Sequence, residues 1–374
     1  MIEMTAPCLF GLEGPLASEL RKLGIRDVRP DNGRVSFSGT EEDLARANIS
    51  LRTAERVLVE LGSFPARTFD ELFEGVRALP WERFIPLTGA FPVKGYSLNS
   101  ALHSIPDCQK IIKKAAAERL GAVYGLERLP ESGALYQIQF SIMRDRAALY
   151  LDSSGAGLHK RGYRPAGGIA PLRETLAAAM IELARYRGRE DFHDPFCGSG
   201  TIVIEAALTA KNRAPGLNRT FSAENWETLD KEIWRRAREE ARTGEFSGDY
   251  RIIGSDIDPK VLELARQNAG RAGVGDIVKF EQADAREFSQ ETARGIVITN
   301  PPYGERMLEK RGAEELYRGF GEAMRALDNW SVYVLSSHEG FEDFYGRRAD
   351  KKRKLYNGMI KCELYMYENR SGGR

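Results

Sequence analysis

The amino-acid sequence predicts an α/β protein whose C-terminal half is a mostly parallel sheet covered by helices. From about residue 170 onward, apolar strand-like segments alternate with helical segments, which is the pattern of a parallel sheet. Close to the end, Asn357-Gly358 lies between two apolar runs and predicts an antiparallel hairpin. Before residue 165 the helices and strands follow one another without this alternation, which predicts two smaller α+β units.

The first α+β unit is expected over residues 1–62. Its predicted segments are a helix at 17–23 that ends at Gly24, a strand at 34–37, a helix that follows the cap Thr40, and a strand at 56–61. No combination of side chains in this unit points to catalysis.

The second α+β unit is expected over residues 63–157, followed by a linker at 158–170. The capping box from Thr68 to Glu71 predicts its first helix. The remaining predicted segments are a strand at 90–96, a helix at 109–120, and strands at 136–142 and 146–152. The unit is locally basic, because residues 90–165 contain eleven Lys and Arg against six Asp and Glu, while the whole chain has a net charge of only +1.

Two features of this basic window are suited to phosphates and stacked bases. Lys110, Lys113 and Lys114 share one face of the predicted helix, although an ordinary solvated helix face explains them equally well. The junction at 158–165 then places three cations and two ring side chains within eight residues. The candidate RNA contacts are Lys94, Lys110, Lys113, Lys114, His159, Lys160, Arg161, Tyr163 and Arg164.

Composition narrows the classes of function. The four cysteines are far apart and form no CxxC pair, which argues against a zinc ribbon and against a disulfide framework. The histidines have no partner at metal-ligand spacing, so no metal is expected. No apolar run is long enough to span a membrane and the N-terminus lacks a signal-peptide pattern. We therefore expect a cytoplasmic protein without a membrane partner, and a monomer.

The C-terminal half is expected to form one domain over residues 171–374. A helix beginning at Pro171 is expected to reach about residue 187. The predicted strands are 191–194, 251–255, 277–282, 295–299 and 331–336, and the further predicted helices are 201–211, 259–272 and 314–327. Residues 212–248, which include Trp226, Trp234 and a charged helix, form an insertion between the first helix and the second strand of this series.

Polar side chains follow the first three of these strands at the points where the strands end. The first strand runs into Asp194-Pro-Phe-Cys-Gly-Ser-Gly-Thr201, whose glycines let a ligand approach the backbone at a helix N-terminus. Asp256, at the second tip, can accept two hydrogen bonds from a ribose diol, while Asp258 serves as a helix cap. Asp284, at the third tip, is placed to meet an adenine amino group.

The fourth strand ends at Asn300-Pro301-Pro302-Tyr303. The two prolines supply no N–H, so the strand stops and presents an amide, carbonyl oxygens and an aromatic ring. Asn300 Oδ1 and the Pro301 carbonyl can each accept an N–H from a planar NH2 group, which stabilises the positive charge that develops on the nitrogen as it reacts. Tyr303 can stack on a base, a contact that contributes about 1–3 kcal/mol. A proline pair that merely ends a strand is the structural alternative.

Taken together, the four strand tips resemble the class I S-adenosylmethionine-dependent methyltransferases that act on exocyclic amines through (Asn/Asp)-Pro-Pro-(Tyr/Phe). The longer pattern is similar to the THUMP-containing RNA guanine-N2 methyltransferases of the bacterial large-subunit rRNA type. The residues that carry this second resemblance are 194–205, 157–163, 171–176 and Trp226 within the insertion.

The resemblance implies a Rossmann-like methyltransferase domain over 171–374, a ferredoxin-like domain over 1–62 and a THUMP RNA-binding domain over 63–157. The catalytic residues would be Asn300, Pro301, Pro302 and Tyr303. S-adenosylmethionine, which leaves as S-adenosylhomocysteine, would contact Asp194, Phe196, Cys197, Gly198, Ser199, Gly200, Thr201, Asp256, Ile257, Asp284, Ala285 and Asn300. The well-known bacterial member carries a further methyltransferase domain, and this sequence stops at Arg374, so only the first activity is expected.

The expected reaction is therefore methylation of guanine N2 in RNA, with ribosomal RNA favoured over tRNA. The same Asn-Pro-Pro-Tyr tip also suits N6 of adenine or the side-chain amide of glutamine, and the basic window favours RNA over protein. Carbon-5 methylation of a pyrimidine is disfavoured, because no cysteine lies near Asn300 in the sequence. An RNA-binding ribosome-assembly factor without enzyme activity is the alternative from another class, and it predicts that S-adenosylmethionine does not bind.

Overall fold

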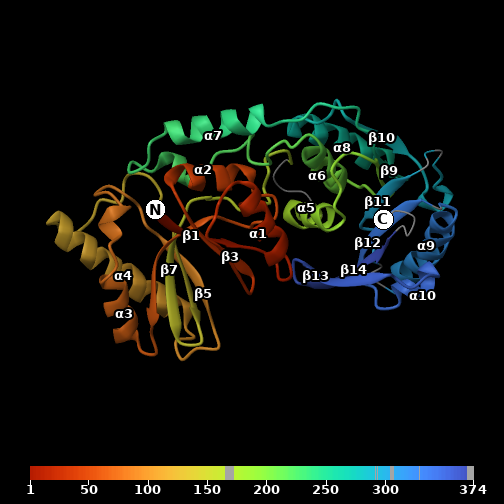
Figure 1. Cartoon of the computed structure of the whole chain (residues 1–374). Coiled ribbons are helices and arrows are strands. Elements are labelled where there is room, and N and C mark those ends of the chain that lie inside the picture. Colours follow the sequence, from red (N-terminus) through yellow and green to blue (C-terminus); the bar gives the residue numbers. More distant parts are fainter. Residues whose placement is uncertain (165–171, 291, 293, 304–306, 328, 369–374) are drawn as a thin grey trace. The chain divides into compact units, whose positions relative to one another are not determined.

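The computed structural model describes the chain except residues 165–171, 291, 293, 304–306, 328 and 369–374, and it describes only the backbone of residues 307–310. The chain forms two compact units (Figure 1). The N-terminal unit contains Met1–Cys8, Ala17–Leu158 and Thr220–Glu240, and the C-terminal unit contains Leu9–Leu16, His159–Arg219 and Ala241–Arg374. No helix among the described residues is long and apolar enough to cross a membrane.

The N-terminal unit is built on a single sheet of seven strands in the order β2-β3-β1-β4-β7-β6-β5. The two small α+β units that the sequence predicts share this sheet, because β4 pairs with β7 along its whole length. The first strand, β1, was not predicted from the sequence, and it lies between β3 and β4. The strands are β1 (Ile2–Pro7), β2 (Val28–Asp31), β3 (Arg34–Gly39), β4 (Leu58–Pro65), β5 (Val93–Leu98), β6 (Ile138–Met143) and β7 (Arg146–Asp152).

One face of this sheet carries the apolar core of the N-terminal unit. Met4, Phe37, Val59 and Leu151 lie on this face in neighbouring strands and are completely buried. The helices are α1 (Glu13–Lys22), of which Ala17 onward belongs to this unit, α2 (Glu41–Ser50), α3 (Phe69–Arg77) and α4 (Ile105–Tyr124), with the short 3-10 helix η1 (Trp81–Arg83).

Both helix caps predicted for this unit are confirmed. The Thr40 side chain accepts from the Asp43 amide at the start of α2, and the Thr68 side chain accepts from the Glu71 amide at the start of α3. Each of the two acidic side chains returns the bond to the cap residue, which satisfies two otherwise unpaired N–H groups. Helix α4 is longer at both ends than the predicted segment 109–120.

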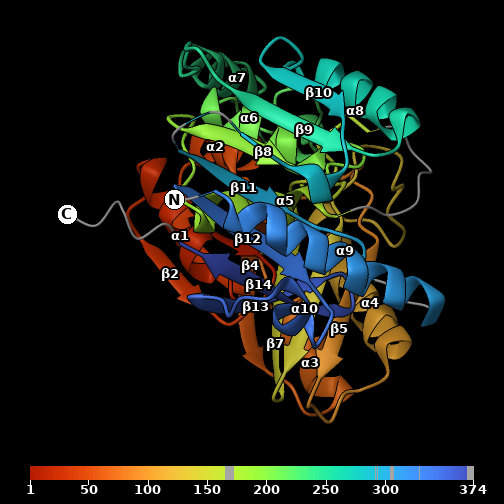
Figure 2. The same ribbon diagram turned by 90° about the vertical axis from the view of Figure 1, so that its right-hand side faces the viewer.

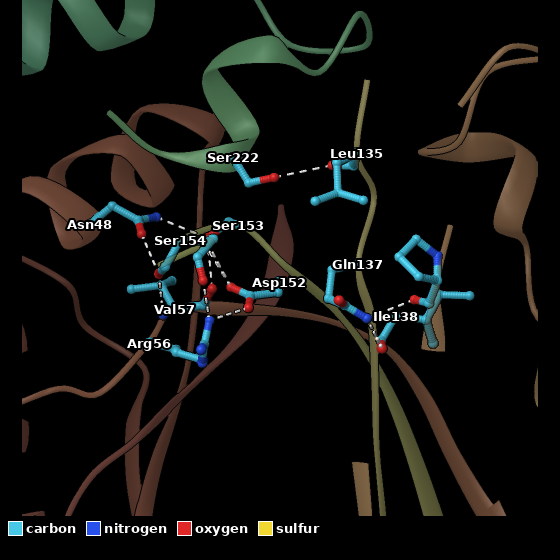
Figure 3. A network of polar contacts seen from close by, with 12 residues as sticks. Asn48, Arg56, Val57, Leu135, Gln137, Ile138, Asp152, Ser153, Ser154 and Ser222 are labelled. Atoms are coloured by element: carbon cyan, nitrogen blue, oxygen red, sulfur yellow. Dashed lines mark hydrogen bonds and ion pairs between the residues drawn. The ribbon is translucent and has the colours of Figure 1, made fainter. Parts of the chain in front are cut away.

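Part of the insertion between residues 212 and 248 packs within the N-terminal unit. The Trp226 ring stacks on Tyr136 with 5.2 Å between ring centroids, and its Nε1 donates to the Leu135 carbonyl at 3.0 Å. The Glu227 amide donates to the Tyr136 hydroxyl at 3.0 Å, and Ser222 donates to the Leu135 carbonyl (Figure 3). The segment contains the 3-10 helix η2 (Ser222–Asn225) and the start of α7 (Glu232–Thr243).

A buried polar network ties the end of β7 to α2 and to the residues before β4 (Figure 3). The Asn48 amide donates to Ser153 Oγ at 2.9 Å and accepts from Ser154 Oγ at 2.6 Å. Arg56 pairs with Asp152, a carboxylate that is almost completely buried. Because each of these groups is bonded, the network fixes the end of the THUMP-like segment against the first α+β segment without leaving a buried charge unpaired.

The C-terminal unit is a second sheet of seven strands, in the order β10-β9-β8-β11-β12-β14-β13, which Figure 2 shows from top to bottom. Neighbouring strands are parallel from β10 to β12, and β14 then runs antiparallel to both β12 and β13. This confirms the predicted parallel sheet with a terminal hairpin. The strands are β8 (Asp191–Asp194), β9 (Ile252–Asp256), β10 (Val278–Gln282), β11 (Gly295–Thr299), β12 (Trp330–Ser336), β13 (Lys351–Asn357) and β14 (Ile360–Tyr367).

Helices flank this sheet, and all five residues of β11 are buried. Tyr317 and Phe320 of α9 pack against Val297, Val332 and Tyr365 of the sheet in one core cluster. The helices are α5 (Glu174–Leu183), α6 (Thr201–Ala210), α8 (Pro259–Ala272), α9 (Met307–Arg325) and α10 (Phe341–Tyr345), with the 3-10 helix η3 (Ala285–Glu287). Helix α9 begins seven residues before the predicted start at 314, and the predicted start of α5 at Pro171 lies outside the described residues.

Candidate active site

The tip of β8 is bonded directly to the tip of β11. The Asp194 carboxylate accepts from the Thr299 hydroxyl at 2.6 Å and from the Phe196 amide at 3.1 Å. The Asp194 side chain is 1% exposed, and burial raises its pKa to about 7, although the bond from Thr299 opposes that rise. The residue just before Asn300 is thereby fixed to the loop that begins at Asp194.

The glycines after Asp194 have conformations that a residue with a side chain rarely adopts. Gly200 has a φ of +85° at the start of α6, and a Cβ there would lie 3.1 Å from both Ala265 and Phe280. Gly198 has a φ of +50°, and no atom lies within 4 Å of the position that its Cβ would occupy. The backbone at Gly198 is therefore open to a ligand at the N-terminal end of α6.

Asp256 joins the second strand tip to the same loop. One of its carboxylate oxygens accepts from the Gly198 amide and the other from the Asp258 amide, each at 3.0 Å. A carboxylate oxygen has two acceptor positions, so both oxygens can still accept from a ribose diol. The neighbouring Ile257 side chain is 63% exposed, so it offers an apolar surface beside this tip.

Asp284, at the third tip, has a partner that the sequence-based prediction did not include. Arg286 pairs with the Asp284 carboxylate at 2.5 Å, and this bond lowers the pKa of the carboxyl group. The Asp284 side chain also accepts from the Arg286 amide and caps η3. Ala285 is buried in the core cluster around α9. A ligand amino group at this tip would therefore share the Asp284 carboxylate with Arg286.

The Asn300-Pro-Pro-Tyr tip is held by two tyrosine hydroxyls. The Tyr303 hydroxyl donates to Asn300 Oδ1, the oxygen expected to accept from the substrate amine. The Tyr317 hydroxyl donates to the Pro302 carbonyl at 2.7 Å. Cys362 Sγ lies 3.7 Å from the Tyr303 hydroxyl, and burial raises the pKa of Tyr303 well above its ordinary value. The acceptor on Asn300 is thus bonded within the chain.

The other predicted cofactor residues lie in the same loop, and among the described residues their side chains contact protein except at Ser199, whose buried hydroxyl has no hydrogen-bond partner. The Phe196 ring packs edge-on against Phe320, and Cys197 is 5% exposed. The Ser199 carbonyl accepts from Asn268 at 3.0 Å, and the Thr201 hydroxyl accepts from Arg164. Any contact between these residues and a ligand would therefore be made largely by their backbone. Among the described residues, no three His, Cys, Asp or Glu side chains are grouped to hold a metal ion.

Two of the predicted RNA contacts require correction. Arg161 and Tyr163 are only 3% and 2% exposed, and both bond to the buried Glu205 carboxylate. Arg161 thus neutralises a charge within the C-terminal unit, and Tyr163 helps to cover it. These two residues are structural, because a guanidinium that compensates a buried carboxylate is not available to a phosphate.

The remaining predicted RNA contacts differ in exposure and in whether they form ion pairs within the protein. Arg164 pairs with Glu174 at 3.3 Å, and His159 is half-buried. Lys94 and Lys160 are exposed. On α4 every lysine stands beside a carboxylate, and the N–O distances are 3.7 Å for Lys110 to Asp107, 2.6 Å for Lys113 to Glu131 and 3.8 Å for Lys114 to Glu118.

Comparison with known families assigns each part of the chain. Residues 161–366 match the RMKL-like methyltransferase domain, residues 3–58 the RlmL ferredoxin-like domain, and residues 66–152 the THUMP domain. The chain belongs to the RMKL-like methyltransferase family. The C-terminal unit is therefore a class I methyltransferase fold, and S-adenosylmethionine is its methyl donor.

Individual relatives agree with this assignment. "Putative RNA methyltransferase YpsC" of Bacillus subtilis is 48% identical over 366 residues, which cover 97% of this chain and 94% of that protein. "Ribosomal RNA large subunit methyltransferase K/L" of Psychromonas ingrahamii is 36% identical over 377 residues, or 98% of this chain and 50% of that protein. The chain thus spans about half the length of the K/L protein. The crystal structure of SMU.472 complexed with SAH has 41% identity and a TM-score of 0.94, with 100% of this chain and 99% of that chain covered.

The residues at the strand tips of this methyltransferase fit S-adenosylmethionine. The open backbone at Gly198 would hold the methionine part, Asp256 would accept from the ribose hydroxyls, and the exposed Ile257 would offer an apolar surface to the adenine ring. Asp284 can accept from the adenine amino group only if it shares its carboxylate with Arg286. The cofactor supplies a methyl group already activated by its sulfonium.

Sequence reasoning missed three residues that shape the site, namely Arg286, Tyr317 and Cys362. Arg286 stands two positions after Asp284, a spacing at which a side chain can return to a capping carboxylate, so a local signal existed. Tyr317 and Cys362 reach the Asn300-Pro-Pro-Tyr tip from α9 and β14, and only the packing of those elements reveals them.

Proposed function

We propose that this methyltransferase transfers a methyl group from S-adenosylmethionine to the exocyclic N2 amine of a guanosine in RNA, with large-subunit ribosomal RNA as the favoured substrate. The observation that carries the proposal is the bond between Asp194 and Thr299, which joins the glycine loop to the residue immediately before Asn300. A planar NH2 group held at Asn300 would then lie at the same sheet edge as the cofactor loop.

In the proposed reaction the residues of the chain bind and orient the amine. When the substrate base enters, its N–H replaces the Tyr303 hydroxyl at Asn300 Oδ1, and its second N–H can bond to the Pro301 carbonyl. Both acceptors stabilise the positive charge that develops on the nitrogen as the new N–C bond forms. The Tyr303 ring, released from Asn300, is then available to stack on the base.

As the N–C bond forms, the bond between the methyl group and the sulfonium sulfur breaks and S-adenosylhomocysteine leaves. The proton that the amine loses passes to solvent water and does not require a strongly basic side chain, because the nitrogen becomes acidic once it carries the methyl group. Alignment of the amine with the activated methyl group supplies much of the rate enhancement. Tyr317 supports this alignment by holding the Pro302 carbonyl, and it is a positioning residue rather than a catalytic one.

RNA as the substrate class is supported by the THUMP and ferredoxin-like matches and by the names of the relatives. Guanine N2 follows from the resemblance of the residues to guanine-N2 methyltransferases, and adenine N6 is the rival acceptor because it presents the same NH2 group. We further propose that the protein acts as a cytoplasmic monomer, with domains at 1–62, 63–157 and 171–374 joined by the linker 158–170.

The experiment that tests this function uses the full chain with methyl-labelled S-adenosylmethionine and unmodified total RNA. The RNA is separated by size, digested to nucleosides and analysed for the labelled nucleoside. Label in N2-methylguanosine from the large ribosomal RNA is the expected result. Label only in tRNA would show that tRNA, and not ribosomal RNA, is the substrate. Label in N6-methyladenosine would show that adenine is the methylated base. Failure of S-adenosylmethionine to bind would favour an RNA-binding assembly factor without enzyme activity.

A further inference from the structure

The sheet of the N-terminal unit has two unlike faces, and the second face is polar and is open along β5 and at the turn between β6 and β7, whereas Ser141 and Tyr150 in the middle of this face are only 5% exposed. Residues on the first face, such as Met4, Phe37 and Phe140, are at most 2% exposed. Burial alternates along β5, so that Lys94, Tyr96 and Leu98 are the exposed residues of that strand. Helix α4 contacts β5 and α3 contacts β4, and both helices are seen in Figure 1. Apart from the parallel pair of β5 and β6 the sheet is antiparallel, and one face of such a sheet can be left to solvent.

The register of the strands places the residues of the open face in three short rows. Leu98 lies beside Met143, and Met143 lies beside Arg146. Tyr96 lies in the next row beside Ser141, and Lys94 lies in the third row beside Gln139 and Tyr150. We call the exposed members of these rows the β5–β7 open face, and they are Lys94, Tyr96, Leu98, Met143 and Arg146.

Among the described residues, the cations of this face form no ion pair, and Glu60, the carboxylate in the row of Lys94 and Tyr150, accepts from the Thr5 hydroxyl at 3.4 Å. Lys94, Arg146 and Arg144, in the turn that joins β6 to β7, form no ion pair with any residue that the structure describes. The one carboxylate of that turn, Asp145, is engaged by Arg67 at 3.2 Å and by the Ala101 amide. The three lysines of α4 all have carboxylate partners, so the unpaired charge lies on the open face and not on the helix.

An aromatic ring stands among these cations. The Tyr96 side chain is 46% exposed, and its hydroxyl lies 4.0 Å from Met143 Sδ. Leu98, in the next row, is 53% exposed. Cations that can meet phosphates around an exposed ring and an apolar floor are the combination that binds single-stranded nucleic acid, because every base can stack on a ring. A paired helix would hide its bases from the ring, so the face is suited to a single strand.

We propose that the β5–β7 open face binds a single-stranded segment of RNA, with a base stacked on Tyr96 and phosphates paired with Lys94, Arg144 and Arg146. This inference rests on the proposed function, which makes RNA the substrate. It moves the RNA contact of the N-terminal unit from the lysines of α4 to the opposite face of the sheet.

The test measures the affinity of the full chain for a fluorescent, unstructured RNA oligonucleotide by anisotropy at several salt concentrations. Tyr96→Ala should weaken binding about 5- to 150-fold, the loss of one stacked base, and Tyr96→Trp should restore it. The double variant K94E/R146E should make binding less dependent on salt. The negative slope of log K against log salt should become smaller in magnitude by about 1.4 or more, since two phosphate contacts to a single strand are lost. The matched control K110E/K114E makes the same change of charge on α4 and should leave the affinity within about twofold of wild type.

The outcomes separate this inference from the function on which it rests. If wild type binds and methylates RNA while Tyr96→Ala and K94E/R146E behave like wild type, the open face is not the RNA contact and a protein partner is its alternative occupant. A loss of affinity in K110E/K114E alone would return the contact to α4. If wild type binds S-adenosylmethionine but no RNA, the proposed function itself fails. Unchanged melting temperatures would show that the exposed substitutions leave the fold intact.

Discussion

Asn300 and Tyr303 share a hydrogen bond that an incoming amine has to replace. The exchange is energetically small, because one bond to Asn300 Oδ1 is broken as another forms, and the net value of a single hydrogen bond is about 1 kcal/mol. It frees the Tyr303 ring at the moment when a base is present to stack on it. In the free protein, the same bond and the contact with Cys362 keep the ring in one position.

Replacement of Asn300 by alanine should stop methyl transfer while the cofactor still binds. The variant lacks the oxygen that accepts the amine N–H, and removal of one such charge-stabilising group typically costs about 100- to 1,000-fold in rate. Single-turnover transfer measures the rate, and calorimetry measures the Kd for S-adenosylmethionine. Asn300→Asp is the matched control, since it retains an acceptor and should keep part of the activity. If Asn300→Ala loses cofactor affinity instead, Asn300 belongs to the cofactor site.

Removal of the Tyr317 hydroxyl should slow transfer without weakening the cofactor. Tyr317→Phe keeps the ring in the core but frees the Pro302 carbonyl, so the Asn300-Pro-Pro-Tyr tip is less well oriented. We expect kcat to fall roughly 10-fold, with KM for S-adenosylmethionine unchanged and a loss of stability of about 1 kcal/mol. Steady-state kinetics and urea unfolding measure these quantities. A rise in KM for S-adenosylmethionine with unchanged kcat would refute a positioning role at the tip.

Asp194 makes stability depend on pH in a direction opposite to that of most carboxylates. Its pKa is raised from 3.8 to about 7 in the folded chain, so between those values the folded state holds a proton that the unfolded state has released. Protonation of Asp194 therefore adds up to roughly 4 kcal/mol to the free energy of unfolding. This stabilisation is complete below about pH 4 and is lost as the pH rises through 7. Asp194→Asn carries no titrating group and should lose less stability than wild type between pH 5 and pH 8 in urea titrations. If the stability of wild type and of Asp194→Asn changed equally with pH, Asp194 would be ionised in the folded chain throughout this range, which would contradict the prediction.

At the scale of elements, capping residues and turns were predictable because their signals are local. Thr40, Thr68 and Asp258 cap helices as the sequence indicates, and Asn357-Gly358 turns the terminal hairpin. Strand β1 escaped prediction although its residues alternate, with Ile2, Met4 and Ala6 apolar and Glu3 and Thr5 polar, so a local signal was present; only its place between β3 and β4 has no local signal. That place is decided by pairing over long separations in sequence, which no local pattern records.

The packing of residues 220–240 on the N-terminal unit was equally hidden, although Trp226 was noted in the sequence. An isolated tryptophan indicates burial but not its partner, and the partner Tyr136 lies 90 residues earlier. The stack, the bond from Trp226 to the Leu135 carbonyl and the bond from the Glu227 amide to the Tyr136 hydroxyl make this segment part of the THUMP-bearing unit.

Replacement of Trp226 by alanine should release this segment. The buried ring is lost together with its stack on Tyr136, and a change of this kind costs about 3–5 kcal/mol. Hydrogen exchange should become faster over residues 220–240 and over the start of β6, and urea unfolding should give the lower stability. Phe246→Ala is the matched control, because Phe246 is in the same insertion but 60% exposed and should have little effect. Equal exchange rates in the two variants would mean that Trp226 does not anchor the segment.

At the scale of the whole molecule, the fold class and the cofactor could be predicted because the sequence pattern that indicates each of them occurs several times along the chain. Alternating strands and helices predict the parallel sheet, and a polar residue at each of four successive tips predicts a ligand edge. The RNA contacts were harder to predict, because a cation in a sequence does not reveal its partner. Arg161 neutralises Glu205, which lies 44 residues later, and Lys113 reaches Glu131 across 18 residues.

The central claim is that the exocyclic amine of guanine is the methyl acceptor, and inosine tests it most directly. Inosine differs from guanosine only in lacking the 2-amino group. Transcripts of the ribosomal RNA substrate are made with guanosine or with inosine at the modified position and incubated with the full chain and labelled S-adenosylmethionine. We predict transfer to the guanosine transcript and none to the inosine transcript, with similar RNA affinity for both. Equal transfer to the two transcripts would contradict methylation at N2.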